Sequence, residues 1–281
     1  MTSTIVFVTD FPDAAIAAQE ITPSGFDLAV VPARSQEYEE ALKTSEFLVG
    51  FVDSLVDDEL FKTGPNLKLI QLLSAGYDRA DIEAARNAGV PIANNGGANS
   101  VAVSEHAILL MLAVSRQLVR QHTTVAAGNW RGNETPRVHE LRNKTLGIVG
   151  LGTIGKKTAR LASAFGMNII YYDIARLAEH EEDAIGVRFR LLKELLRESD
   201  LISLHTPLNN STHHLIGREE LSLMKESAIL VNTARGPVID EAALYDALVE
   251  GKILAAGLDV FDLEPPQPDN PLFKLDNVIL S

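Results

Sequence analysis

The segment Gly150–Gly155 (GLGTIG) constrains the fold of this chain more than any other feature. It follows the apolar run Leu146–Val149, which has the composition of a buried strand, and a helix is predicted from Ile154 to Phe165. In a G-x-G-x-x-G segment the first glycine permits a tight turn, and the second lets the backbone approach a pyrophosphate. The third allows close packing of helix on strand. Because free N–H groups at a helix start attract phosphate, the segment predicts a dinucleotide site.

Asp173 ends the next predicted strand, 18 residues after Gly155. A carboxylate at this distance accepts hydrogen bonds from the adenosine ribose hydroxyls, and it repels the additional phosphate of NADP. We therefore expect NAD as the cofactor. Arg176 lies nearby and could weaken that preference, although a solvated surface position is the simpler interpretation of this residue.

Short β-rich runs alternate with helical stretches along the chain, which is typical of parallel sheets covered by helices. Strands are expected at Ile5–Thr9, Leu28–Val31, Phe47–Phe51, Leu69–Leu73, Val90–Ala93, Thr145–Val149, Asn168–Tyr172, Leu201–His205, Ala228–Asn232, Ile253–Leu258 and Asn277–Leu280. Helices are expected at Asp13–Glu20, Ser35–Thr44, Asp57–Lys62, Arg79–Ala88, Ile154–Phe165, Leu191–Glu198, Arg218–Leu223 and Glu241–Glu250. The pattern predicts an α/β protein with two flavodoxin/Rossmann-like, doubly wound parallel-sheet domains and a cleft between them.

The turn cluster 94–99 (NNGGAN) is the best break in the first half, so we expect domains at 1–98 and 99–281. A long helical stretch follows, from about Ser100 to Ala127, and its middle, Ala107–Val114, is apolar all round. Such a helix is buried on several sides. Three packings stay open: between the domains, against a second subunit in a homodimer, or inside one large domain.

The composition excludes several classes of function. The net charge of −13 argues against a nucleic-acid binder, which needs a basic face. The absence of cysteine excludes disulfides, thiolate nucleophiles and cysteine-based zinc sites. The longest apolar run is too short to span a membrane, and the N-terminus lacks the features of a signal peptide. We therefore expect a cytoplasmic protein.

Three polar segments follow predicted strands of the second half. They are 204–212 (LHTPLNNST), 231–240 (VNTARGPVID) and 257–265 (GLDVFDLEP). Because the carboxyl ends of parallel strands line the ligand crevice of an open sheet, these segments are candidates for the functional site.

Together with the glycine loop, these segments resemble the NAD-dependent D-2-hydroxyacid dehydrogenase family, which includes D-3-phosphoglycerate dehydrogenases. The resemblance covers essentially the whole chain. It takes in 74–78 (SAGYD) and 99–105 (NSVAVSE), where the family usually has Ala in place of Ser104. It implies an enzyme that interconverts a D-2-hydroxy acid and its 2-oxo acid by hydride transfer. Residues 1–98 would be the substrate-binding domain and 99–281 the NAD-binding Rossmann domain.

The resemblance also assigns chemical roles. Arg235 matches the arginine that clamps the carboxylate and carbonyl of the 2-oxo acid, a bidentate task that suits a planar guanidinium. Glu264 matches the carboxylate that pairs with the catalytic histidine, which would raise the pKa of that histidine and orient it. The family holds the substrate carboxylate with backbone amides of the segment that matches Ser74, Ala75 and Gly76.

Cofactor contacts follow from the same matching. They fall on Gly150, Gly152, Thr153, Ile154, Gly155, Asp173, His205, Thr206, Pro207, Thr212, Thr233, Ala234, Arg235 and Asp259. Asp259 is expected to face the nicotinamide carboxamide, and in the family's pattern His205 is not the proton donor. No histidines have the spacing of a metal site, so we expect no metal.

In the family, the segment matching 276–281 (DNVILS) runs on into Pro-His, and that histidine is the general acid/base. We therefore expect a truncated chain rather than a natural end at Ser281. Such a chain would bind NADH but turn over 2-oxo acids at least about a hundredfold more slowly than a form continuing through Pro-His.

Other functions stay open. One is a non-catalytic NAD(H)-responsive module, as in the related C-terminal-binding corepressors. A relative of S-adenosylhomocysteine hydrolase would need its own catalytic Lys and Asp constellation, which is not found. A D-3-phosphoglycerate dehydrogenase needs a cationic phosphate pocket, for which Arg79, Arg131 and Arg137 are candidates. The sequence does not name the acid, and glyoxylate, hydroxypyruvate and larger substrates remain open.

Overall fold

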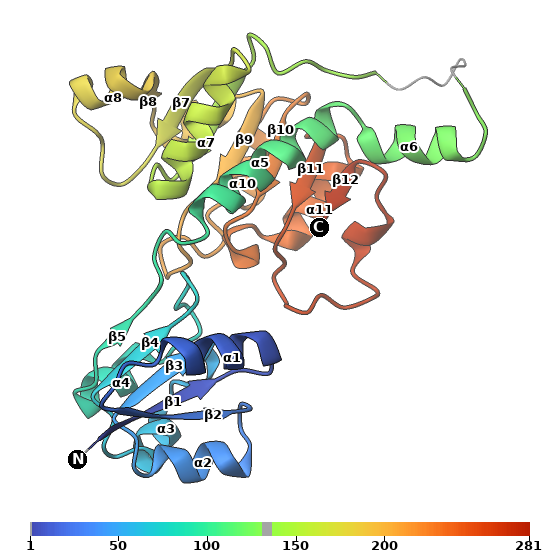
Figure 1. The fold of residues 1–281 in the computed structure, drawn as a ribbon. Helices are drawn as coiled ribbons and strands as arrows, with labels where there is room; N and C mark the ends of the chain where they lie inside the picture. The colour runs from blue at the N-terminus through green and yellow to red at the C-terminus, as the bar shows by residue number, and fades with distance from the viewer. Residues whose placement is uncertain (1, 131–136) are drawn as a thin grey trace. The chain divides into compact units, whose positions relative to one another are not determined.

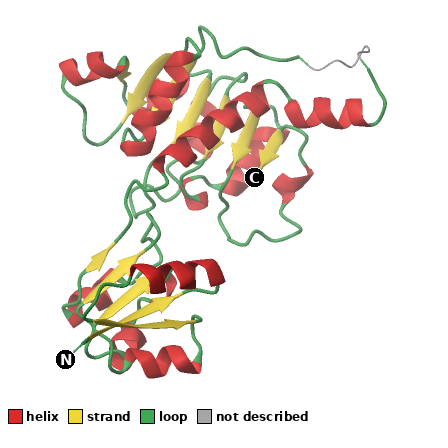
Figure 2. Cartoon of the chain, viewed as in Figure 1, coloured by secondary structure: helices red, strands yellow, loops and turns green. Residues whose placement is uncertain are grey.

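The computed structural model describes residues 2–130 and 137–281, which form two compact units (Figure 1). The first unit ends at Asn99, and the second runs from Ser100 to Ser281. In both units all strands of the sheet are parallel, which confirms the α/β class with two parallel sheets (Figure 2). Arg131 lies outside the described residues.

The sheet of the first unit has the strand order β2-β1-β3-β4-β5. Its strands are β1 Ser3–Val8, β2 Phe26–Val31, β3 Phe47–Gly50, β4 Leu69–Leu72 and β5 Ile92–Ala93. Its helices are α1 Pro12–Ile21, α2 Gln36–Leu42, α3 Asp58–Thr63 and α4 Ile82–Ala88, with a 3₁₀ turn, η1, at Asp53–Leu55. α4 begins at Ile82, later than expected, because the Asp81 side chain accepts the Ala84 N–H and caps the helix there.

The sheet of the second unit has the order β12-β11-β10-β9-β6-β7-β8. Its strands are β6 Thr145–Val149, β7 Asn168–Tyr172, β8 Val187–Phe189, β9 Leu201–Leu204, β10 Ile229–Asn232, β11 Ala255–Leu258 and β12 Val278–Leu280. Its helices are α5 Ser100–Ser115, α6 Leu118–Ala126, α7 Thr153–Ala164, α8 Glu179–Ile185, α9 Leu192–Glu198, α10 Arg218–Leu223 and α11 Glu241–Val249. Its described residues also include the 3₁₀ turns η2 Gly236–Val238 and η3 Pro271–Lys274.

The core of the second unit has two layers, one on each face of the sheet. Apolar residues of α5 and α7 form one layer with strand residues such as Ile148. Residues of α9, α10 and α11 form the other, with strand residues such as Leu204 and Leu230. This unit is therefore doubly wound, and its strand order reverses at β6, which lies between β9 and β7. Open parallel sheets bind ligands at the carboxyl ends of the strands flanking such a reversal.

The expected helical stretch from Ser100 to Ala127 is two helices. Gln117 has a positive φ of 50° between α5 and α6, and the two helix axes differ by 59°. α5 packs on α7 and against β10, β11 and β12, so its apolar middle is buried largely within its own unit. α6 buries none of its side chains. In the described parts of the chain no single helix is long and apolar enough to cross a membrane, and α5 with α6 meets that test only as a bent pair.

Candidate functional site

The three glycines of the Gly150–Gly155 loop have different surroundings. Gly150 has a positive φ of 93°, and a Cβ on it would lie 2.8 Å from the carbonyl of His205. A Cβ on Gly155 would lie 2.3 Å from the carbonyl oxygen of Gly150. Around Gly152, in contrast, no described heavy atom lies within 4 Å of an added Cβ. Packing within the protein therefore explains Gly150 and Gly155, whereas the space at Gly152 is open to a ligand.

Backbone hydrogen bonds join the strand ends on both sides of this loop. The Gly150 N–H donates to Tyr172 O at 2.8 Å, and the His205 N–H donates to Val149 O at 2.8 Å. The residues after β6, β7 and β9 are thereby brought together at the carboxyl edge of the sheet. Asp173 and His205, which are 32 positions apart in the sequence, flank the same loop.

Asp173 is half-buried and is anchored on the glycine loop. Its Oδ2 accepts the Leu151 N–H at 2.7 Å, and its Oδ1 accepts the Ala175 N–H at 2.9 Å. A carboxylate offers about four acceptor positions, so both oxygens retain capacity for ribose hydroxyls. The acid is held in place before any ligand arrives.

Three buried polar atoms at this edge have no hydrogen-bond partner among the described residues. They are His205 Nδ1, Thr206 Oγ1 and Thr233 Oγ1. His205 and Thr206 follow β9, and Thr233 follows the neighbouring strand β10. Buried polar groups are nearly always satisfied, by protein, water or ligand. This cluster of unsatisfied groups beside the glycine loop fits a bound dinucleotide.

His205 is neutral at neutral pH. Burial lowers its pKa to about 4, because an apolar environment disfavours the charged imidazolium. Its Nε2 lies 3.0 Å from Ser203 Oγ. A histidine with this pKa is a poor source of protons at neutral pH.

The loop after β9 is shaped by Thr212. Its Oγ1 donates to Pro207 O at 2.6 Å and accepts the Asn209 N–H at 2.9 Å. The Thr212 hydroxyl therefore closes the turn that carries Pro207.

The turn that presents Arg235 depends on two residues that the sequence analysis did not single out. Asn232 Oδ1 accepts the Ala234 N–H at 3.0 Å, and Asn232 Nδ2 donates to Arg235 O at 2.9 Å. A Cβ on Gly236 would lie 1.8 Å from the carbonyl of Phe261, so only glycine permits this approach. The available signal was an asparagine at a strand end, with Gly-Pro starting four residues later.

Glu264 belongs to the loop whose Phe261 carbonyl contacts Gly236. Its Oε1 accepts the Phe261 N–H at 3.2 Å, while the Phe261 carbonyl packs against Gly236 next to Arg235. The loop is also tied to α11, because Glu241 accepts the Asp262 N–H at 2.5 Å and Asn270 Nδ2 at 3.1 Å. Arg235 and Glu264 are therefore presented by two backbone segments in direct contact.

Asp259, after β11, meets a histidine from α5. Asp259 Oδ1 lies 3.4 Å from His106 Nε2 and 3.3 Å from Ser281 Oγ, and the last two atoms are 2.8 Å apart. His106 is a contact that the sequence did not indicate. No cluster of three or more potential metal ligands occurs in the part of the chain that the structure describes.

In the first unit, the Ser74–Gly76 loop follows β4. Ser74 Oγ donates to Gly76 O at 2.7 Å, Asn94 Nδ2 donates to Ala75 O at 2.6 Å, and the Asn95 N–H donates to Ser74 O at 3.0 Å. Each of these bonds uses a carbonyl oxygen of the loop and none uses its amides. The loop is thus anchored from its carbonyl side.

Residues 108–281 match the family described as "D-isomer specific 2-hydroxyacid dehydrogenase, NAD binding domain". The chain belongs to this family. It is an oxidoreductase that interconverts 2-hydroxy and 2-oxo acids, and its second unit is a nicotinamide-dinucleotide-binding domain.

Individual proteins of the family are similar over most of the chain. A glyoxylate reductase of Korarchaeum cryptofilum is 42% identical over 245 residues, which cover 86% of this chain and 74% of that protein. A D-3-phosphoglycerate dehydrogenase of Methanocaldococcus jannaschii is 43% identical over 245 residues, but only 46% of that protein is covered. The structure of a D-lactate dehydrogenase from Aquifex aeolicus, complexed with NAD and lactic acid, superimposes with a TM-score of 0.86. It is 31% identical, with 99% of this chain and 87% of that chain covered.

The candidate site thus includes contacts beyond the residues named from the sequence. Asn232 and Gly236 shape the Arg235 turn, and His106 contacts Asp259. Glu241 anchors the loop of Glu264. Asn232 and Gly236 have a local signal in the sequence, whereas no short motif marks His106 or Glu241, whose partners are distant along the chain.

Proposed function

We propose that this chain uses NAD in preference to NADP to interconvert a small D-2-hydroxy acid and its 2-oxo acid, with glyoxylate as the 2-oxo substrate. The observation that carries the cofactor preference is the position of Asp173 after β7, hydrogen-bonded to the glycine loop. A fixed carboxylate there accepts ribose hydroxyls and repels a 2′-phosphate. The similarity to a glyoxylate reductase supports the substrate.

A phosphorylated substrate such as phosphoglycerate is less well supported. Arg79 forms two hydrogen bonds with the buried carboxylate of Asp53, from Nε at 2.8 Å and from Nη2 at 3.0 Å. Breaking a pair with a buried carboxylate is costly, so Arg79 is a poor phosphate ligand. The backbone carbonyl of Arg137 accepts a hydrogen bond from Gln117 Nε2 at 3.0 Å.

The cofactor contacts proposed here are those that the family resemblance assigns. They are Gly150, Gly152, Thr153, Ile154, Gly155, Asp173, His205, Thr206, Pro207, Thr212, Thr233, Ala234, Arg235 and Asp259. NAD, when bound, supplies the hydride acceptor or donor. The N-terminus of α7 would bind the pyrophosphate, Asp173 the ribose, and Asp259 the carboxamide.

The substrate would be held by side-chain and backbone groups. Arg235 is proposed to bind the carboxylate and polarise the carbonyl, since a guanidinium makes two parallel hydrogen bonds. Backbone amides of Ser74, Ala75 and Gly76 would hold the carboxylate in the substrate-binding domain, residues 1–98. Glu264 would orient the histidine that serves this family as general acid/base, and His205, with its low pKa, would stay neutral.

Two copies of the chain are proposed to associate through the Ser100–Ala127 helical region. α6 exposes about half of each of the apolar side chains of Leu118, Val119 and Val125, and it has no buried side chain. Such a surface is costly in water, which favours a self-complementary contact. Sedimentation should give a dimer, and the double substitution L118E with V125E should give a monomer.

The proposed function is tested by calorimetry and turnover. NADH should bind at least about tenfold more tightly than NADPH. Among 2-oxo acids, glyoxylate should consume NADH faster than phosphohydroxypyruvate. R235K should lower kcat/KM about a hundredfold, because an ammonium cannot replace the bidentate fork. Equal affinity for both cofactors, or faster reduction of the phosphorylated acid, would contradict the proposal.

A further inference from the structure

The loop between β7 and α8 contains two charged residues that favour opposite cofactors. Asp173 begins the loop, and Arg176 follows three residues later. An acid at the end of this strand suits the ribose of NAD, whereas an arginine nearby accommodates the 2′-phosphate of NADP. The cofactor preference of this loop therefore depends on where the Arg176 guanidinium lies.

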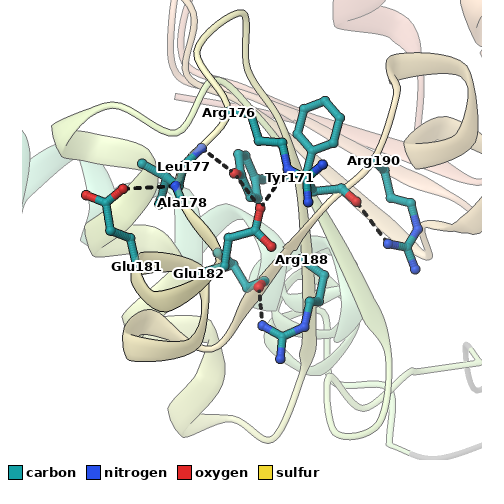
Figure 3. A network of polar contacts seen from close by, with 10 residues as sticks. Tyr171, Arg176, Leu177, Ala178, Glu181, Glu182, Arg188 and Arg190 are labelled. Atoms are coloured by element: carbon teal, nitrogen blue, oxygen red, sulfur yellow. Dashed lines mark hydrogen bonds and ion pairs between the residues drawn. The ribbon is translucent and has the colours of Figure 1, made fainter.

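The backbone on both sides of Arg176 is fixed. The Ala175 N–H donates to Asp173 Oδ1 at 2.9 Å, and the Leu177 N–H donates to the Tyr171 hydroxyl at 2.9 Å. The Ala178 N–H donates to Glu181 Oε2 at 3.0 Å and completes the loop (Figure 3). With its neighbours held, Arg176 can redirect only its side chain.

The guanidinium of Arg176 is held by a buried carboxylate. Glu182, on α8, is 3% exposed, and its Oε1 lies 3.4 Å from Arg176 Nε (Figure 3). The same Oε1 accepts the hydroxyl of Tyr171 at 3.0 Å, and Tyr171 is fully buried. Arg176 Cζ also lies 5.1 Å from the centre of the Phe189 ring, within cation–π range. The guanidinium is therefore not merely a solvated surface group, although 62% of the side chain is exposed.

A buried carboxylate holds its cation more firmly than an exposed one does. Removal of the cation leaves an uncompensated charge in a poorly solvated place, which is strongly unfavourable. Turning Arg176 toward a 2′-phosphate would break its contacts with both Glu182 and Phe189. The neighbouring exposed pair, Arg188 Nη2 with Asp183 Oδ1 at 2.7 Å, lacks this constraint because both side chains are more than half exposed.

We propose that Glu182 is a positioning residue for cofactor choice, which keeps Arg176 on the α8 side of the loop and withholds it from a 2′-phosphate. The proposal rests on the proposed NAD preference. Asp173 then acts against NADP without a compensating cation. Glu182 would thus influence the choice between NAD and NADP without contacting either cofactor.

The test is calorimetric titration of the full chain with NADH and with NADPH. E182Q retains an acceptor for Tyr171 but loses the charge that holds Arg176. We expect E182Q to bind NADPH about fivefold more tightly than wild type, the scale of one charge-assisted hydrogen bond, with NADH affinity within about twofold. In the double variant R176Q/E182Q the gain should disappear.

Two further variants separate positioning from stability. Y171F removes the buried hydroxyl but keeps the Glu182–Arg176 pair, so it should lower thermal stability without changing the ratio of the two affinities. R176Q alone should leave NADPH affinity unchanged, and this readout does not require E182Q to fold. Loss of NADPH affinity in R176Q would overturn the proposal, as would an E182Q gain that persists without Arg176.

The outcomes also separate this inference from the proposed function. Wild type that binds both cofactors equally would contradict the NAD preference and the inference with it. A preference for NADH that E182Q leaves unaltered would overturn the inference alone.

Discussion

The Oδ2 atom of Asp173 lies 2.7 Å from the backbone nitrogen of Leu151 and accepts its N–H. Leu151 is the second residue of the glycine loop, so the acid after β7 also stabilises the loop after β6. The glycine loop and the Asp173 carboxylate are thereby one hydrogen-bonded assembly. Changes at Asp173 should affect cofactor choice and loop geometry together.

Replacing Asp173 should therefore show two separable effects. D173N keeps one acceptor oxygen but loses the charge, and we expect NADH affinity to fall about tenfold while NADPH affinity rises. D173A loses both backbone contacts and should cost about 1 kcal/mol of unfolding free energy in addition. Titration and urea unfolding measure the two effects. Unchanged selectivity in D173N would show that the charge does not discriminate.

Gly152 and Gly155 should respond differently to alanine. G152A places a methyl group in open space and at an ordinary φ of −71°, so the apo protein should keep its thermal stability. NADH affinity should nevertheless fall at least about tenfold, because the methyl group displaces the pyrophosphate. G155A should instead lower the Tm, since its Cβ meets Gly150 O at 2.3 Å. Full NADH affinity in G152A would argue against a pyrophosphate at this place.

The unpartnered hydroxyl of Thr233 should matter for binding more than for folding. T233V preserves shape and removes an unsatisfied polar atom, so apo stability should be unchanged or slightly higher. NADH affinity should fall about threefold to tenfold if the hydroxyl bonds the cofactor. Thr158, a buried threonine of α7 whose hydroxyl is equally unpartnered, provides the matched control. T158V should leave NADH affinity unchanged, and equal losses in both variants would indicate a packing effect.

His205 should make stability depend on pH in a defined direction. Burial lowers its pKa from 6.5 to about 4, so in the window between these values the unfolded chain binds the proton and the folded chain does not. The contribution of His205 to the free energy of unfolding is fully present above about pH 6.5. It is lost as the pH falls toward 4, by at most about 3 kcal/mol. Urea unfolding across this window should show a steeper loss for wild type than for H205N. Parallel curves would contradict the lowered pKa.

Much of the second unit could be predicted from local patterns. Leu146–Val149 and the glycine loop were placed correctly, because an apolar run followed by a turn and a helix is encoded in neighbouring residues. Strand β8 and helix α8 were not predicted. β8 has only three residues, and α8 (EHEEDAI) is polar except for its last two residues, so neither segment has an apolar periodicity that would indicate it. The break at Gln117 was also missed, since a positive φ at glutamine has no reliable local signal.

Candidate site residues could be proposed from the sequence where a strand end and a motif coincide, as at Asp173, Arg235 and Glu264, and their roles stay predictions. Residues that act through partners distant in the sequence could not be predicted in this way. Glu241 looks ordinary in the sequence, and its hydrogen bond with the Asp262 N–H joins residues 21 positions apart that only the tertiary fold brings together.

The sequence by itself determined the alternating elements, the glycine loop and the acid 18 residues beyond it, because each depends on short-range spacing. Only the tertiary structure decided which charges meet. Glu182 could hold Arg176 or lie in solvent, and the outcome depends on its burial beside Tyr171, which packing of α8 on the sheet provides. Ion pairs and unsatisfied hydroxyls depend on solvent exclusion, and solvent exclusion is a property of the folded chain.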